Sequence, residues 1–102
     1  MNPPEKFTRI IDRKKYSVET STLIGHDAFW DGHNWERHGR NTFLYRTPGG
    51  NYFTVTLTQW QGERDHLEPI SQDEAIHLYE NALSEHEVPY SKAFPGVEIE
   101  DA

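Results

Sequence analysis

Histidine and carboxylate side chains crowd together in residues 25–41, a stretch with three glycines and no clean period that we expect to form a long loop. Imidazole and carboxylate groups are common zinc ligands, so this stretch could in principle bind a divalent metal ion. Its spacing matches no zinc motif such as the helical His-Glu-x-x-His, and a flexible loop leaves ligands unorganised. We therefore expect no metal and no cofactor at these residues, which are His26, Asp27, Asp31, His33 and His38.

A second group of catalytic side-chain types surrounds His66, where Glu63, Asp65 and Glu68 lie close in sequence. A general base needs burial or a close like charge to shift its pKa, and this segment is polar throughout. The chain also has no Gly-x-Ser-x-Gly nucleophile elbow. The Pro48-Gly49-Gly50-Asn51 segment lacks the lysine and the glycine spacing of a phosphate-binding loop. These observations predict that the protein is not an enzyme.

Charge is distributed very unevenly along the 102 residues, whose net charge is −7. Residues 1–50 contain eight basic and six acidic side chains, whereas residues 51–102 contain two basic and eleven acidic ones. The second half should therefore repel nucleic acid and anionic membranes, and it should be attracted to basic surfaces that normally hold DNA or RNA. The simpler alternative is that the acidic surface only keeps the protein soluble.

Composition indicates one small domain spanning residues 1–102, with termini at 1–6 and 96–102 that we expect to be flexible. Hydrophobic residues make up only 34%, but aromatic residues reach 13% and each ring buries a large area. No cysteine is present, which excludes disulfides and thiolate metal sites and fits a reducing compartment. No apolar run approaches the ~20 residues needed to span a bilayer, and the first residues do not resemble a secretory signal. We therefore expect a protein of the cytoplasm that does not contact membranes.

Two hairpins are predicted in the first 58 residues. Phe7–Ile11 and Lys15–Val18 are β-prone segments around a polar turn, and Thr42–Thr47 and Tyr52–Thr58 flank the Pro48–Asn51 reversal. In the last segment Phe53, Val55 and Leu57 should face the core, and the alternate residues, Tyr52, Thr54, Thr56 and Thr58, should face water. Thr20–Ile24 could be a strand or one helical turn, and Trp60–Pro69 is turn-like.

The C-terminal half contains one amphipathic helix. Ser71 followed by Glu74 is a capping box, which predicts a helix from Gln72 to about Glu85, and Pro89 limits its extension. The last stretch, Tyr90–Ala102, could be an edge strand or a frayed tail. Together with the hairpins, this gives an α+β fold in which the helix packs on a small antiparallel sheet. The residues of its sheet-facing stripe are Ala75, Ile76, Tyr79, Ala82 and Leu83.

The same helix carries a row of polar side chains at steps of four, three, four and three residues, namely Asp73, His77, Glu80, Ser84 and Glu87. Asp73 and Glu80 should lie roughly 10 Å apart. Carboxylates at such intervals could occupy arginine and lysine positions that otherwise hold phosphates, although a solvated helix face is the simpler interpretation. Two tryptophans are possible apolar anchors, or one of them covers the core. The predicted partner-binding residues are Asp73, His77, Glu80, Glu87, Trp30, Trp35, Glu98, Glu100 and Asp101.

One further pattern spans four short segments, which are Ile10–Thr20, Leu23–Gly25, Leu44–Phe53 and Pro69–Ala75. Together they resemble a family of small uncharacterised proteins encoded by bacteria, phages and mobile elements. The chain departs from that pattern in the Trp- and His-rich middle loop and at Leu78-Tyr79, where a tryptophan–leucine pair is expected. The resemblance implies no catalytic residue. In its family setting, small size and acidity, the protein is also similar to the phage-encoded inhibitors of bacterial defence, including anti-CRISPR proteins.

The leading hypothesis is therefore a non-enzymatic binding protein that occludes a basic, nucleic-acid-binding surface of a larger protein or ribonucleoprotein complex. It would act as a monomer or homodimer, without a cofactor and without binding nucleic acid itself. The alternative is an accessory nucleic-acid-binding or regulatory module. That module would use the basic residues of the first hairpin, which are Lys6, Arg9, Arg13, Lys14 and Lys15.

Overall fold

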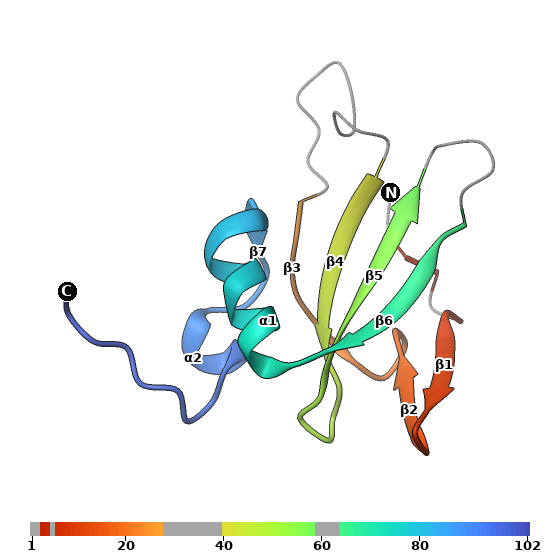
Figure 1. Ribbon diagram of the computed structural model, residues 1–102, viewed down its shortest axis with the longest axis horizontal. Helices are drawn as coiled ribbons and strands as arrows, with labels where there is room; N and C mark the ends of the chain where they lie inside the picture. The colour runs from red at the N-terminus through yellow and green to blue at the C-terminus, as the bar shows by residue number, and fades with distance from the viewer. Residues whose placement is uncertain (1–2, 5, 28–39, 59–63) are drawn as a thin grey trace.

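The computed structural model describes residues 3–4, 6–27, 40–58 and 64–102. It confirms an α+β fold in which antiparallel sheets dominate and a short helix packs against them (Figure 1). One sheet has two strands and the other has five, in the order β6-β5-β4-β3-β7. The strands are β1 (Thr8–Ile11), β2 (Lys14–Ser17), β3 (Thr22–His26), β4 (Arg40–Arg46), β5 (Tyr52–Thr58), β6 (His66–Ile70) and β7 (Glu85–His86).

The first hairpin forms a sheet of its own. Its turn has two residues, Asp12 and Arg13, rather than the three expected from sequence, because Lys14 already pairs with Ile11. Both turn residues have positive φ angles of 52° and 66°, as the tight turns that match the twist of paired strands require. Arg9 ties the hairpin to the large sheet by donating from Nη1 to the carbonyl oxygen of Leu67 at 2.7 Å.

The second hairpin has the predicted strands and turn, but both faces of its sheet are covered. Phe43 pairs with Val55 on one face, and Leu44 pairs with Thr54 on the other. Tyr52 and Thr54 are buried, so the expectation of one water-facing side is wrong for this part of the sheet. The reason is that the C-terminal helices cover the face of the sheet on which Tyr52 and Thr54 lie.

The face toward the first hairpin is packed with aromatic rings. Tyr45 stacks on Phe53 with ring centroids 5.2 Å apart, and Tyr16 of β2 meets Phe53 edge-on at 5.7 Å. None of the side chains in this cluster is more than slightly exposed, and its other members are Phe43, Val55, Leu57 and Leu67. The hairpin is therefore held by aromatic packing as well as by the Arg9 hydrogen bond.

Burial in this cluster raises the pKa of Tyr45 to about 12. Between pH 10 and pH 12 the folded protein keeps a proton that the unfolded chain releases, so the free energy of unfolding should fall as the pH rises. The free energy of unfolding should fall by less than about 3 kcal/mol between pH 10 and pH 12. Urea unfolding of wild type and Tyr45→Phe at neutral and alkaline pH checks it, and the variant should show a shallower decline. Equal declines would contradict this assignment.

The opposite face carries α1 (Gln72–His77), which continues as a π-helix, η1 (Leu78–Ala82). The predicted capping box is confirmed, because the Ser71 side chain accepts a hydrogen bond from the Glu74 backbone and the Glu74 carboxylate accepts one from the Ser71 backbone. We expect Ser71→Ala to lower the free energy of unfolding by about 1 kcal/mol. Urea unfolding measures the loss, and an unchanged midpoint would mean that packing alone sets the start of the helix.

The helix ends at Ala82, earlier than the predicted Glu85. The backbone N–H of Leu83 donates to the carbonyl of Leu78, five residues back, and Leu83 itself is extended. This wider turn changes which side chains face the sheet, so Leu83 is buried and Ala82, predicted to be in the stripe, is exposed. Glu85 lies instead in β7, a two-residue strand that pairs with Gly25 and His26 of β3.

Gly25 allows this close pairing. A side chain at that position would place its Cβ 2.8 Å from the carbonyl oxygen of Glu85, so only glycine fits without a shift. The register between β3 and β4 also slips between Leu23 and Gly25, which turns Ile24 toward the helices.

Three segments differ from the sequence expectations in their boundaries. The predicted loop 25–41 contains strand residues at both ends, because Gly25 and His26 belong to β3 and Arg40 and Asn41 belong to β4; residues 28–39 lie outside the described residues. Residues 66–69, expected to be turn-like, belong to edge strand β6 (His66–Ile70). The stretch after Pro89 contains α2 (Tyr90–Ala93), a short helix that was not predicted.

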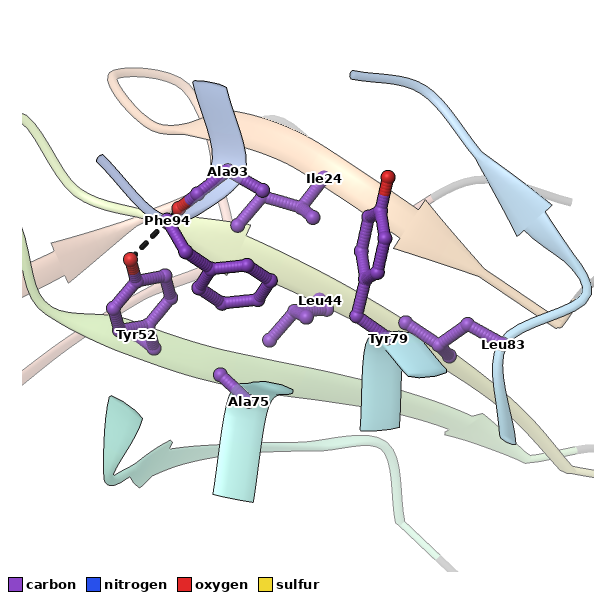
Figure 2. Packing of buried hydrophobic residues seen from close by; sticks show 8 residues of the cluster. All are labelled: Ile24, Leu44, Tyr52, Ala75, Tyr79, Leu83, Ala93 and Phe94. Carbon is purple, nitrogen blue, oxygen red and sulfur yellow. Dashed lines mark hydrogen bonds between the residues drawn. The ribbon is translucent and has the colours of Figure 1, made fainter. Parts of the chain in front are cut away.

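The core under the helices joins the sheet to both C-terminal helices (Figure 2). Tyr52 of β5 donates its hydroxyl to the Ala93 carbonyl at 2.7 Å, and its ring lies 5.4 Å from that of Phe94. This packing fixes α2 against the sheet. The eight buried residues of the cluster are Ile24, Leu44, Tyr52, Ala75, Tyr79, Leu83, Ala93 and Phe94.

Candidate acidic interface

The first hairpin and the C-terminal helices, two segments of opposite charge, pack on opposite faces of the five-stranded sheet, and Figure 1 shows their ribbons on different sides of it. Residues 71–102, here called the acidic layer, contain eight acidic side chains and one basic side chain, Lys92. Residues 6–18, here called the basic hairpin, contain five basic side chains and one acidic side chain, Asp12. The asymmetry along the sequence thus becomes an asymmetry in space, and a basic partner would be steered toward the acidic layer.

The helix presents only part of the predicted row. Asp73 and His77 lie on α1 and Glu80 lies on η1, and all three are exposed. Ser84 and Glu87 do not continue the row, because the helix ends before them and the chain turns into β7. The expectation of five residues on one helix face is therefore wrong beyond Glu80.

Two of the carboxylates are held in place by neighbours. Glu80 accepts a hydrogen bond from the Tyr90 hydroxyl at 2.9 Å. Burial raises the pKa of Tyr90, and the hydrogen bond and negative charge of Glu80 raise it further, as does Tyr79. Glu87 lies 3.4 Å from Nε2 of His26, across the edge of the sheet, and the pair attracts when the histidine is protonated. Both carboxylates remain exposed, so they are oriented without being neutralised.

Tyr79 organises the layer beneath these carboxylates. Its hydroxyl donates to the Val88 carbonyl at 2.8 Å, and its ring stacks on His86 with centroids 3.7 Å apart. His86 Nε2 also lies 2.7 Å from the Tyr79 carbonyl oxygen. Edge-on contacts with Tyr90 and Phe94 bring α2 to the same ring. One side chain therefore connects the helix, β7 and α2.

The C-terminal tail adds three exposed carboxylates, Glu98, Glu100 and Asp101. Between them lies Ile99, which is 71% exposed. An apolar side chain among acidic ones is a candidate anchor that the sequence analysis missed, although the Val97–Ile99 alternation was its signal. The two anchors predicted from sequence, Trp30 and Trp35, lie outside the described residues.

A hollow of about 380 Å³ opens on the acidic layer beside α1. Leu78 gives it an apolar wall, and the charged and polar residues on it are Asp73, Glu74 and His77. Within the described part of the chain, no three histidine or carboxylate side chains come together so as to hold a metal ion. The hollow therefore offers an apolar surface beside negative charge, which suits the stem and head of a basic side chain.

The segment around His66, weighed above for acid–base chemistry, is part of strand β6 or directly precedes it. Asp65, His66 and Glu68 are all exposed. Asp65 accepts a hydrogen bond from the backbone of Thr58 at 2.8 Å, which joins the ends of β5 and β6. The structure thus gives Asp65 a structural role, and Glu63 lies outside the described residues.

Comparison of the chain with known proteins finds no matching family model, no matching curated protein and no matching solved structure. In the described part of the chain, no helix combines the length and the apolar character needed to cross a bilayer.

Proposed function

We propose that this protein is a non-enzymatic inhibitor that binds a basic, nucleic-acid-binding surface of a larger protein or ribonucleoprotein complex and occludes it. The observation that supports this most is the concentration of acidic side chains in residues 71–102, whose helices pack on the sheet face opposite the basic hairpin. A partner's positive groove would meet carboxylates on α1, η1 and the tail. Such binding is steered by long-range attraction and weakens with added salt.

The surface can also supply more than charge. Ile99 in the tail and Leu78 beside the hollow offer apolar contacts within reach of the carboxylates. Apolar contacts surrounded by polar groups are typical of protein–protein interfaces. The resemblance to phage- and mobile-element-encoded proteins favours a bacterial defence complex as the target, in the manner of anti-CRISPR proteins, and the host cytoplasm as the place of action.

The proposal is tested by capture and competition. The immobilised protein is incubated with nuclease-treated bacterial lysate, and each captured complex is purified and tested for binding to labelled duplex DNA or RNA. We expect the protein to displace the nucleic acid in a concentration-dependent way. Captured complexes that bind nucleic acid equally well with and without the protein would contradict the proposal.

A further inference from the structure

We infer that this protein associates with a second copy of itself head to tail, the basic hairpin of one copy seating in the hollow on the acidic layer of the next. The inference does not depend on the function proposed above, because both surfaces belong to this chain. It follows from two features that complement each other in charge and in apolar character.

The first feature is an apolar side chain among basic ones at the end of the basic hairpin. Ile10 is 73% exposed, although isoleucine is among the residues most often buried. The pairing of β1 with β2 places Lys15 directly opposite Ile10. Arg13 and Lys14, in and next to the two-residue turn, are exposed as well. The end of the hairpin therefore combines one exposed apolar side chain with three basic ones, against the single acidic side chain of Asp12 in the turn.

The second feature is the hollow of about 380 Å³ beside α1. Its apolar wall, Leu78, could receive Ile10, while Asp73 and Glu74 could meet the lysine and arginine heads around it. The volume lies in the range of pockets that accept small ligands, so it admits a side chain of this size. The carboxylate of Glu74 also takes part in the capping box, which leaves Asp73 as the principal partner.

These two features cannot meet within one copy. The basic hairpin packs on one face of the five-stranded sheet, and α1 packs on the other. A contact between them must therefore join two molecules, and the surfaces that meet are different patches. Such a head-to-tail contact is heterologous, so it continues into a ring or a chain of copies unless something blocks its ends.

Duplex nucleic acid is the competing ligand for the basic hairpin. It would attract the lysines and arginines, but it provides no hollow with an apolar wall to receive Ile10. The second copy matches both the charge and the apolar side chain. At physiological salt, repulsion between whole molecules is screened beyond about 8 Å, so these local contacts decide the outcome.

Sedimentation velocity at physiological salt tests the inference with two variants. The hairpin variant, Ile10→Glu with Lys15→Glu, keeps an intact hollow, and the hollow variant, Asp73→Lys with His77→Lys, keeps an intact hairpin. We expect wild type to form assemblies larger than a dimer as its concentration rises toward about 1 mM, a weak affinity. Each variant alone should stay monomeric, and an equimolar mixture should form a one-to-one dimer and nothing larger.

The control is Glu19→Lys, which changes the charge of an exposed residue outside both surfaces and should assemble like wild type. Three results would overturn the inference. Wild type could remain monomeric throughout, the mixture could fail to dimerise, or wild type could bind a labelled DNA duplex in a mobility-shift assay that the hairpin variant fails. None of these measurements involves a third protein, so such a failure would leave the proposed inhibitor function to be judged separately.

Discussion

Replacing Asp73 and Glu80 with lysine should weaken binding to the basic partner by about 100-fold or more. Both carboxylates are exposed on one continuous helix, and the double substitution turns two attractions into two repulsions. Most of the loss should appear as slower association at low salt, because charges at the rim of an interface act by steering. Surface plasmon resonance against the captured complex, at two salt concentrations, measures both rates.

The control for this prediction carries the same change in net charge elsewhere. Glu19→Lys with Glu68→Lys alters two exposed residues outside the acidic layer and should reduce affinity much less. Each lysine in the test variant also removes a local stabilising contact. Lysine at position 73 removes a negative charge from the first turn of the helix, and lysine at position 80 removes the acceptor of the hydrogen bond from Tyr90. Urea unfolding should show a cost of about 1–2 kcal/mol in total. Equal losses of affinity in test and control would show that net charge, and not the acidic layer, governs binding.

Local signals in the sequence predicted the elements whose cause is local. The capping box of Ser71 and Glu74 fixes where α1 begins, because both hydrogen bonds lie within four residues. The turn between β4 and β5 is equally local, since Gly50 adopts the positive φ of 87° that a glycine tolerates best. Neither feature needs any other part of the fold.

The end of the helix was missed because its cause lies elsewhere in the chain. The sequence continues to favour helix up to Glu85, but that residue pairs with His26 of β3, almost sixty positions earlier. The pairing requires the open backbone at Gly25 and a π-turn that releases the chain at Leu83. Helical periodicity contains no information about a distant strand edge.

The character of the second sheet face was missed for a related reason. A row of threonines reads as water-facing when one strand is considered alone, because antiparallel sheets often leave one face wet. Thr54 is buried because the C-terminal helices cover its face. Threonine fits this position because its side chain is small and its methyl group can pack against apolar neighbours. The alternation of residue types along the strand does not reveal this property.

For the candidate interface, the sequence predicted the charge but not its arrangement. Counting acidic residues was enough to identify the C-terminal half as negative. It could not show that Glu87 would meet His26 across the sheet edge, or that Ile99 would stay exposed among the tail carboxylates. Both facts depend on how β7 and α2 pack against the rest of the fold, and Tyr79 contacts both of these elements.

Replacing Tyr79 with alanine should therefore lower the free energy of unfolding by about 3–5 kcal/mol, since it removes a buried ring from the centre of the layer. That is a large share of the 5–15 kcal/mol typical of whole domains. The matched variant Tyr79→Phe keeps the ring contacts with His86 and Phe94 and loses only the hydrogen bond to Val88, so it should cost about 1 kcal/mol. Urea unfolding of the three proteins measures both costs.

The same pair of variants separates charge from geometry in the proposed function. Tyr79→Ala removes no carboxylate, yet it releases the segment that carries Glu85 and Glu87 and removes a ring that packs against Tyr90, the hydrogen-bond partner of Glu80. At a temperature where this variant is still folded, we expect weaker binding to the basic partner than for Tyr79→Phe. If the two variants bind equally, the acidic layer acts only through its total charge, and its packing on the sheet contributes nothing to recognition.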